Sequence, residues 1–225
     1  MLNETDTSAR RFFLQAIDAD SNCPVYEVGF TASDVRMLIS LIGEGLSDIK
    51  CAYDLPLTTA LKIVNQYDVS FDSSGHPVRL RPSSAHDNLP YRVHTGRELL
   101  LMLQGVKPLA VFSHPVEQVL TEERFFEPHV TIGRFVKREY STPMLLRRRG
   151  DSKDLTYRHV LYALAHEAWR IDAYILLQDV MTQEGWSAGL ERMEGELLGY
   201  TKWQNDIFVE YMKRAQEEGM QRKER

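Results

Sequence analysis

Hydrophobic positions in the first third of the chain predict one strand and two amphipathic helices. Residues 25–30 are mostly apolar and lie between a proline and a threonine, which favours a strand. Apolar residues then recur every three or four positions over 35–42 and over 56–67, the spacing that lines one face of a helix. Gly43 ends the first of these two patterns. The segment 12–17 is also apolar, but its length fits a strand or a helix.

The chain changes character between residues 70 and 90, where serine, aspartate, asparagine and proline are frequent. Only 78–81 has the composition of an extended segment. We therefore expect a long loop, and such loops in compact domains are usually functional or mobile. The alternative is that 70–90 joins a small N-terminal lobe, 1–70, to the rest of the chain.

A helix and a strand with clear boundaries follow this loop. Thr95 and Glu98 have the spacing of a capping box, and Gly105 stands where a helix commonly ends. Between them, 99–103 is apolar on every side, so the helix is expected to be buried at the centre of the core. The apolar segment 109–112 is predicted to be a strand.

The C-terminal half is predicted to contribute three strands and two final helices. Residues 129–140 have strand-like content, with a possible bulge at Gly133. The apolar runs 158–164 and 169–177 are expected to form a hairpin, because apolar side chains alternate along the second run. The alternative is that the second run is a helix that continues to Thr182. The stripes of the final helices consist of Trp186, Leu190, Met193 and Leu197, and of Trp203, Ile207, Tyr211 and Ala215.

This order of elements predicts an α+β fold, with a mostly antiparallel sheet, helices at the N-terminal side and two C-terminal helices. We expect a single domain over 1–225. The content of 43% hydrophobic and 26% charged residues is ordinary for a globular protein and excludes disorder along the whole chain. The net charge of −5 gives no overall attraction to nucleic acid or anionic membranes.

The cysteines and the absence of targeting segments predict a cytoplasmic protein. Cys23 and Cys51 are interpreted as isolated, small and buried side chains rather than a pair, because a secreted domain of this size more often carries a fuller disulfide framework. The first residues lack the basic and then apolar order of a signal peptide. No apolar run approaches the roughly 20 residues that span a bilayer.

Short catalytic and cofactor signatures are absent from the sequence. It contains no glycine-rich dinucleotide or phosphate loop, no G-x-S-x-G elbow, no C-x-x-C and no H-E-x-x-H. The spacings of the seven histidines match no closed metal site. We therefore expect no cofactor, and a bound metal is the lesser alternative.

The first candidate site is an anion site at the predicted helix start around His94 and Arg97. The free N–H groups of a first helical turn can hold an anion, and two basic side chains would strengthen the binding. The alternative is simpler: Thr95 and Glu98 cap the helix, and Arg97 is a solvated charge.

The second candidate site combines Glu167, Arg170 and Asp172 with His166 and His159. On a strand, Arg170 and Asp172 would point to the same face, and the group could perform acid/base chemistry or hold a metal. The alternative is an ion pair between Arg170 and Asp172 on the solvent-facing side of an antiparallel sheet.

Two further candidates suit macromolecular partners. A basic group with a loop of three consecutive arginines could bind phosphates or an acidic partner, the alternative being a solvated loop. Trp203 begins the last helix, behind a capping box of Thr201 and Gln204, and is either core packing or part of a partner surface. The basic group consists of Arg134, Lys137, Arg138, Arg147, Arg148 and Arg149.

These observations favour an accessory or binding protein that acts through a protein partner, or as a homodimer. One alternative is an enzyme acting on an anionic small molecule or phosphoester, with a site near His94 and Arg97 to which Glu167, Arg170 and Asp172 contribute. The other alternative is a nucleic-acid-associated protein that uses the loop 147–149.

Overall fold

The computed structural model describes residues 9–43, 48–148 and 151–223, with side chains undescribed at 85, 144–148, 151–155 and 218–223. The chain divides into two compact units, Met1–Arg97 and Glu98–Arg225. Each unit has its own antiparallel sheet.

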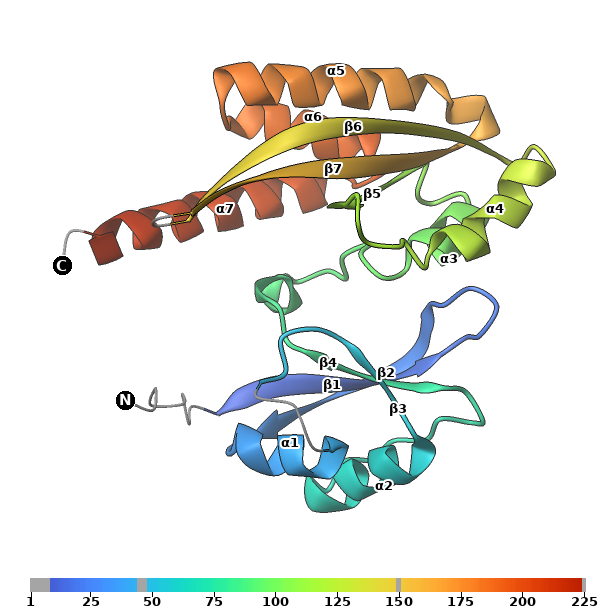
Figure 1. Ribbon diagram of the computed structural model, residues 1–225, viewed down its shortest axis with the longest axis vertical. Helices are drawn as coiled ribbons and strands as arrows, with labels where there is room; N and C mark the ends of the chain where they lie inside the picture. The colour runs from blue at the N-terminus through green and yellow to red at the C-terminus, as the bar shows by residue number, and fades with distance from the viewer. Residues whose placement is uncertain (1–8, 44–47, 149–150, 224–225) are drawn as a thin grey trace. The chain divides into compact units, whose positions relative to one another are not determined.

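The N-terminal unit is built on a four-stranded sheet in the order β2-β1-β4-β3 (Figure 1). Every neighbouring pair is antiparallel. The predicted strand over 25–30 is confirmed, the undecided segment 12–17 is also a strand, and the extended segment 78–81 enters the sheet rather than a loop. The strands are β1 (Arg10–Ile17), β2 (Pro24–Ala32), β3 (Tyr53–Leu55) and β4 (Val78–Pro82).

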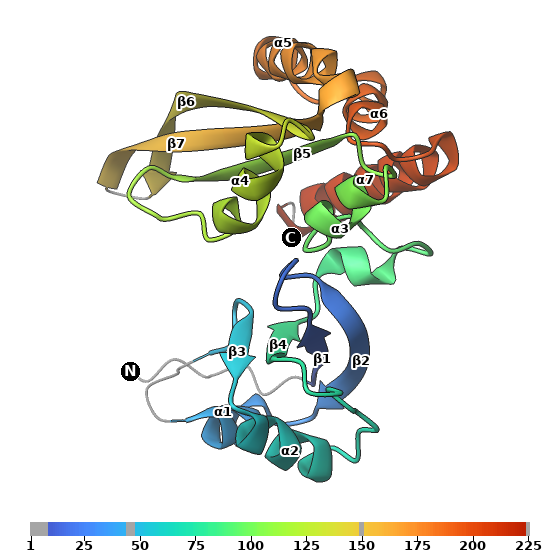
Figure 2. The ribbon, with the colours of Figure 1, turned by 90° about the vertical axis from the view of Figure 1, so that its right-hand side faces the viewer.

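Two helices cover one face of this sheet, as both ribbon views show (Figures 1 and 2). They are α1 (Val35–Ile42) and α2 (Leu57–Gln66), within a residue of their predicted bounds at most ends. Asp34 caps α1 by accepting a hydrogen bond from the N–H of Arg36. Alternate residues of β1 turn toward the helices, and the resulting core contains Phe12, Leu14, Leu38, Ile63 and Leu80.

The other face of the N-terminal sheet carries charged and aromatic side chains. Residues 83–97 follow β4 and include the short 3-10 helix η1 (Ala85–Asn88). Arg81 on β4 forms two hydrogen bonds of 2.9 Å each to the carboxylate of Asp87 in η1. This bidentate pair ties the segment that follows β4 to the sheet.

The C-terminal unit is built on a three-stranded sheet in the order β5-β7-β6. Its strands are β5 (Leu109–Pro115), β6 (Phe135–Arg148) and β7 (Asp151–Leu164). β6 and β7 pair from Phe135–Leu164 to Arg148–Asp151, so the hairpin is longer than predicted and lies earlier in the chain. The predicted pairing of 158–164 with 169–177 is therefore wrong, and 165–167 is the 3-10 helix η2 (Ala165–Glu167) rather than a turn between strands.

Helices pack on both faces of the C-terminal sheet. On one face, Phe126 of α4 (Glu123–Thr131) contacts the rings of Phe112, Phe135 and Tyr162. On the other face, α5 (Trp169–Glu184) and α6 (Ala188–Leu197) pack on alternate residues of the strands. The core on this second face contains Leu109, Leu161, Ala163, Ile171, Tyr174, Leu177 and Leu197.

The segment 169–184 is a helix, against our preference for a strand. The apparent alternation of Trp169, Ile171, Ala173, Ile175 and Leu177 is misleading, because Trp169 is 57% exposed and Tyr174, which is out of phase with the alternation, is buried. The buried side chains are Ile171, Tyr174 and Leu177, which recur every three positions as a helix requires. Whether the segment adopts the two-residue period of a strand or the 3.6-residue period of a helix depends on which side chains can be buried on the sheet. The sheet itself is formed by residues distant in the sequence.

Residues 129–140 are also divided differently from the prediction. α4 ends at Thr131, Gly133 adopts a φ of +73° in the connection, and the strand begins only at Phe135. Arg147 and Arg148 belong to β6 rather than to a loop. Arg149 lies outside the described residues.

The helix around 99–103 is α3 (Glu98–Leu103), and its residues Leu99, Leu101 and Met102 are buried as predicted. The last helix, α7 (Lys202–Lys223), begins with the predicted capping box: the N–H of Thr201 donates to Gln204 Oε1, and the N–H of Gln204 donates to Thr201 Oγ1.

The predicted apolar stripe of α7 is wrong. Trp203 is 55% exposed and Ala215 is exposed, whereas Asn205 and Val209 are buried. A polar residue at a packed position breaks the apolar periodicity, so the sequence pattern selects the wrong face.

The α+β class with antiparallel sheets is confirmed, with three helices rather than two at the C-terminus. Among the described residues, no helix is both long enough and apolar enough to cross a membrane.

Candidate functional site

An apolar groove lies between α5 and α6 in the C-terminal unit. It has a volume of about 540 Å³. Trp169, Leu176 and Met193 line it and are 57%, 65% and 54% exposed, so three large apolar side chains face solvent at one place. Contiguous exposed apolar surface of this kind is typical of interaction sites. The rest of the lining consists of Arg170, Ala173, Leu177, Val180, Leu190, Glu196 and Leu197.

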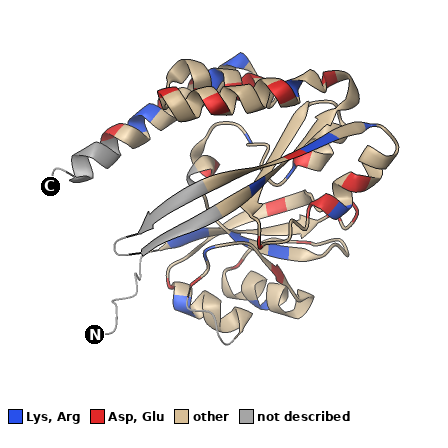
Figure 3. Cartoon of the chain, turned by 45° about the horizontal axis from the view of Figure 1, so that its top comes forward, with Lys and Arg blue, Asp and Glu red and all other residues tan. Residues whose placement is uncertain are grey.

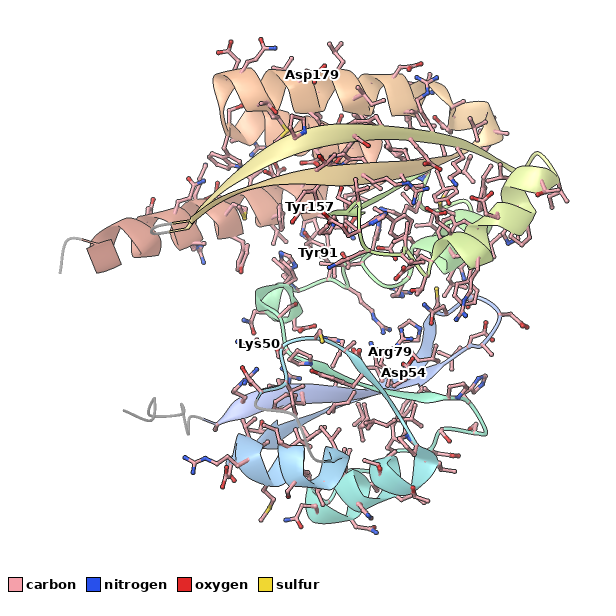
Figure 4. All side chains as sticks on the ribbon, in the orientation of Figure 1. Lys50, Asp54, Arg79, Tyr91, Tyr157 and Asp179 are labelled. Carbon is pink, nitrogen blue, oxygen red and sulfur yellow. The ribbon has the colours of Figure 1, made fainter. Side chains whose placement is uncertain are left out.

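Three acidic residues form a rim at and next to the groove, and one of them, Glu196 of α6, lines the groove itself. Asp179 and Glu184 do not line it, but they follow the lining residues Leu176 and Val180 by about one helical turn on α5. All three are exposed, and within the described part of the chain none forms an ion pair. Figure 3 marks the acidic residues of these helices in red, and Figure 4 labels Asp179 on α5.

The structure separates the predicted group of Glu167, Arg170 and Asp172. Arg170 donates to Glu167 at 2.9 Å and to the carbonyl of Glu196 at 2.9 Å, with its guanidinium over the Trp169 ring. Asp172 instead pairs with Arg138 on β6, because residues two apart on a helix point in different directions. The Arg170 contacts hold one end of the groove in place. They leave no shared face for acid/base chemistry between Arg170 and Asp172.

A larger cleft lies on the open face of the sheet in the N-terminal unit. It has a volume of about 940 Å³ and is lined from β1, β2, β4 and the segment 83–97. Five arginines and two carboxylates line it, an excess of three positive charges. These charged residues are Arg11, Arg79, Arg81, Arg92, Arg97, Glu27 and Asp87.

Two of the five arginines are neutralised by carboxylates. Arg81 bonds to Asp87 and, at 3.0 Å, to Glu27, and these carboxylates raise its pKa although burial opposes the rise. The pKa of Asp87 is lowered because its bonds to Arg81 and to the N–H of Ser84 outweigh the cost of burial. Arg79 bonds to Asp54 at 2.6 Å, and Figure 4 labels both residues.

The other three arginines lack a carboxylate at hydrogen-bond distance in the described part of the chain. Arg92 lies 3.8 Å from Oε1 of Glu27, whose other oxygen, Oε2, accepts from both Arg81 and Gln15. The guanidinium of Arg11 lies over the Phe13 ring. Burial, and secondarily the charge of Arg92, lower the pKa of Arg97.

The predicted anion site at a helix start has a different setting. α3 begins at Glu98, so Thr95 lies three residues before it in a turn closed by the N–H of Arg97 and the carbonyl of His94. His94 is buried and is not among the residues that line the cleft, whereas Thr95 and Arg97 line it. Thr95 and Arg97 of the predicted site therefore lie in the wall of the cleft. The first turn of α3, which the prediction placed at the site, does not line the cleft.

The predicted basic group does not form one patch. Lys137 bonds to Glu127 and Glu139 at 2.6 and 2.7 Å, and these contacts raise its pKa against the effect of burial. Arg138 pairs with Asp172, and Arg134 donates to the carbonyl of Leu103. Three of the six residues thus have partners within their own unit, and neither the side chains of Arg147 and Arg148 nor residue 149 is described.

Sequence reasoning missed a line of three hydrogen-bonded side chains across the second sheet. Ser113 Oγ lies 2.8 Å from His159 Nδ1, and Thr142 Oγ1 lies 2.7 Å from His159 Nε2, with the ring of Tyr140 stacked on the imidazole. Burial, and then the charge of His114, lower the pKa of His159. Because both ring nitrogens are engaged by hydroxyls, no carboxylate orients the imidazole as in a catalytic triad. We interpret the line as a bridge between three strands.

Within the described residues, no group of three or more histidine, cysteine, aspartate or glutamate side chains is placed to hold a metal ion. No protein-family model, curated protein sequence or solved structure matches this chain.

Proposed function

We propose that this chain is a binding protein whose C-terminal unit docks an amphipathic helix of a partner protein in the groove between α5 and α6. The observation that carries the proposal is the exposure of Trp169, Leu176 and Met193 in one groove. Helix-in-groove recognition uses such a floor to hold apolar side chains spaced three or four positions apart.

The rim indicates the charge of the partner. Of the six acidic residues on α5 and α6, Asp172 pairs with Arg138, and Glu191 and Glu194 accept hydrogen bonds from other side chains. The other three, Asp179, Glu184 and Glu196, are exposed, and the two helices carry only two basic residues. Both basic residues are engaged, Arg170 by Glu167 and Arg192 by Asp206. Exposed carboxylates around an apolar floor favour a helix that carries lysine or arginine beside its apolar stripe, because complementary charge aids encounter and fixes orientation.

The test uses three synthetic helices with the full chain: an amphipathic helix of leucine and lysine, its leucine and glutamate counterpart, and a lysine and alanine helix that lacks the apolar stripe. We expect the first to bind and to shift the fluorescence of Trp169, a shift that Trp169→Phe removes. Leu176→Ser should weaken binding roughly 10- to 100-fold, the effect of removing about 1.5–3 kcal/mol of side-chain burial.

Ile132→Ser is the matched control, because Ile132 is 74% exposed, belongs to the same unit and lies outside the groove. Equal weakening by both variants, or equal binding of all three helices, would contradict docking at the groove. Light scattering tests the remaining possible occupant of the groove, which is a second copy of this chain. If the chain is a dimer and Leu176→Ser dissociates it, the groove is a self-association surface, and the proposal of a separate partner is wrong.

A further inference from the structure

The cleft of the N-terminal unit has the construction of a small-molecule site. Its floor is the open face of the sheet, and its wall is the segment 83–97, which the bidentate bond between Arg81 and Asp87 ties to β4. The volume of about 940 Å³ lies within the range of pockets that hold cofactors and metabolites, roughly 300–1,000 Å³.

The charges of the cleft indicate an anion. Arg79 and Arg81 are paired with carboxylates at hydrogen-bond distance, whereas Arg92 has only a longer ion pair of 3.8 Å with Glu27. Arg11 and Arg97 form no ion pair with a carboxylate of the described residues. Arg11 and Arg92 are exposed, but Arg97 is half-buried, and keeping its guanidinium charged there has a cost that its pKa, lowered by burial and then by the charge of Arg92, reflects. The Nε of Arg97 is buried and has no hydrogen-bond partner among the described residues. A bound anion would remove that cost and accept charge-assisted hydrogen bonds.

The three arginines lie on two sides of the cleft. Arg11 belongs to β1 of the floor, whereas Arg92 and Arg97 belong to the wall. A ligand with more than one negative charge can engage both sides at once. The five arginines exceed the three carboxylates that pair with them, Glu27, Asp54 and Asp87, by two charges.

From these observations we propose that the cleft binds a small polyanion, a molecule with two or more phosphate or carboxylate groups. Guanidinium groups bind both kinds of oxyanion in a bidentate manner, so the chemistry is shared. The proposal does not depend on the groove of the C-terminal unit, because every residue that lines the cleft belongs to the N-terminal unit.

Cys51 provides a direct reporter of occupancy. It is exposed and lines the cleft, whereas Cys23 is 3% exposed. The rate at which iodoacetamide alkylates Cys51, followed by mass spectrometry of the full chain, therefore reports whether the cleft is filled. Iodoacetamide is uncharged, so the arginines do not concentrate the reagent itself.

The experiment titrates pyrophosphate and citrate separately, with sodium chloride holding the ionic strength constant because screening alone weakens such contacts. We expect at least one of them to slow alkylation with a saturable dependence, and the preference between them distinguishes phosphate from carboxylate ligands. Arg11→Gln and Arg97→Gln should each weaken the apparent affinity roughly 10- to 100-fold, the loss expected of a charge-assisted hydrogen bond.

Arg36→Gln is the matched control, because Arg36 is exposed on α1 and lies outside the cleft. Circular dichroism confirms that each variant is folded, and two independent arginine variants keep the test valid if one unfolds. Absence of protection by both probes would overturn the proposal, as would protection that Arg11→Gln and Arg97→Gln leave unchanged. Protection by a short single-stranded oligonucleotide alone would also overturn it, in favour of nucleic acid.

Discussion

Gly195 in α6 is the position where a single methyl group should most clearly disturb the C-terminal helices. A Cβ atom there would lie 1.9 Å from Oδ1 and 2.7 Å from Cγ of Asn205 on α7. Asn205 is 5% exposed, so its amide has little room to move away. Gly195→Ala must therefore displace either the amide or the whole of α7 from α6.

The expected change in the free energy of unfolding is the sum of two destabilising contributions and one stabilising contribution. Overpacking a filled site costs about 1–3 kcal/mol, and leaving a buried amide without its hydrogen bonds costs about 1–3 kcal/mol. Alanine in place of glycine within a helix returns about 1 kcal/mol. We therefore expect Gly195→Ala to lower the free energy of unfolding by about 1–5 kcal/mol, although helix propensity alone predicts stabilisation.

The assay is urea denaturation followed by circular dichroism at about 222 nm, which reports helix content. A change of ~1 kcal/mol in the free energy of unfolding shifts the midpoint of this transition measurably. Gly189→Ala is the control on the same helix, because its Cβ would approach nothing closer than Ser187 Oγ at 3.8 Å. That variant should be stabilised by roughly 0.5–1 kcal/mol. In an Asn205→Ala background, Gly195→Ala should lose its penalty, which a double-mutant cycle measures as coupling. If Gly195→Ala and Gly189→Ala are equally stable, Asn205 does not pack on Gly195, and the described α6–α7 contact is wrong.

Three further predictions concern the same unit. Gly199→Ala should cost about 2–5 kcal/mol in urea denaturation, because alanine is strained at a φ of +88° and its Cβ would lie 2.4 Å from Pro108 Cδ; an unchanged midpoint would contradict the positive φ. Burial lowers the pKa of Lys107 to about 8, so its charged form destabilises the fold, and stability should rise from pH 8 to about 10.5. Lys107→Met should be more stable at pH 7 and lack this rise, and equal slopes in the two proteins would refute the burial of the amine. Burial raises the pKa of Glu194 despite hydrogen bonds from Tyr174 and Gln178, so the carboxylate form is disfavoured and stability should fall as pH rises above 4.5. Glu194→Gln should flatten that part of the stability–pH profile, and an unchanged slope would count against a raised pKa.

The sequence alone determined those elements whose signals are local. The stripes of α1 and α2, and the end of α1 at Gly43, could be predicted because helical spacing and a terminating glycine are signals within one segment. The strand over 25–30 and the capping box of Thr201 and Gln204 also have local signals. In the capping box, the side chains themselves satisfy backbone groups that would otherwise lack a partner.

The candidate sites could be predicted only in fragments. Arg97 and Arg170 are both predicted site residues, but they belong to different units. Arg170 keeps Glu167 as a partner, whereas Asp172 of the same predicted group pairs with Arg138 instead. The groove was missed because an exposed tryptophan or leucine on a helix has the same sequence pattern as a buried one. Only the position of α6 beside α5 shows that Trp169 and Leu176 lie over a groove rather than in the core.

The chain's local chemistry thus fixed the α+β class, the caps and most N-terminal elements, because each depends on contacts between residues a few positions apart. Tertiary structure decided that 169–184 is a helix, that Asn205 rather than Trp203 is packed, and that arginines from residue 11 to residue 97 meet in one cleft. The physical reason is that burial on a sheet face and the convergence of charges depend on pairings across long sequence separations. No periodicity or spacing within a single segment records those pairings.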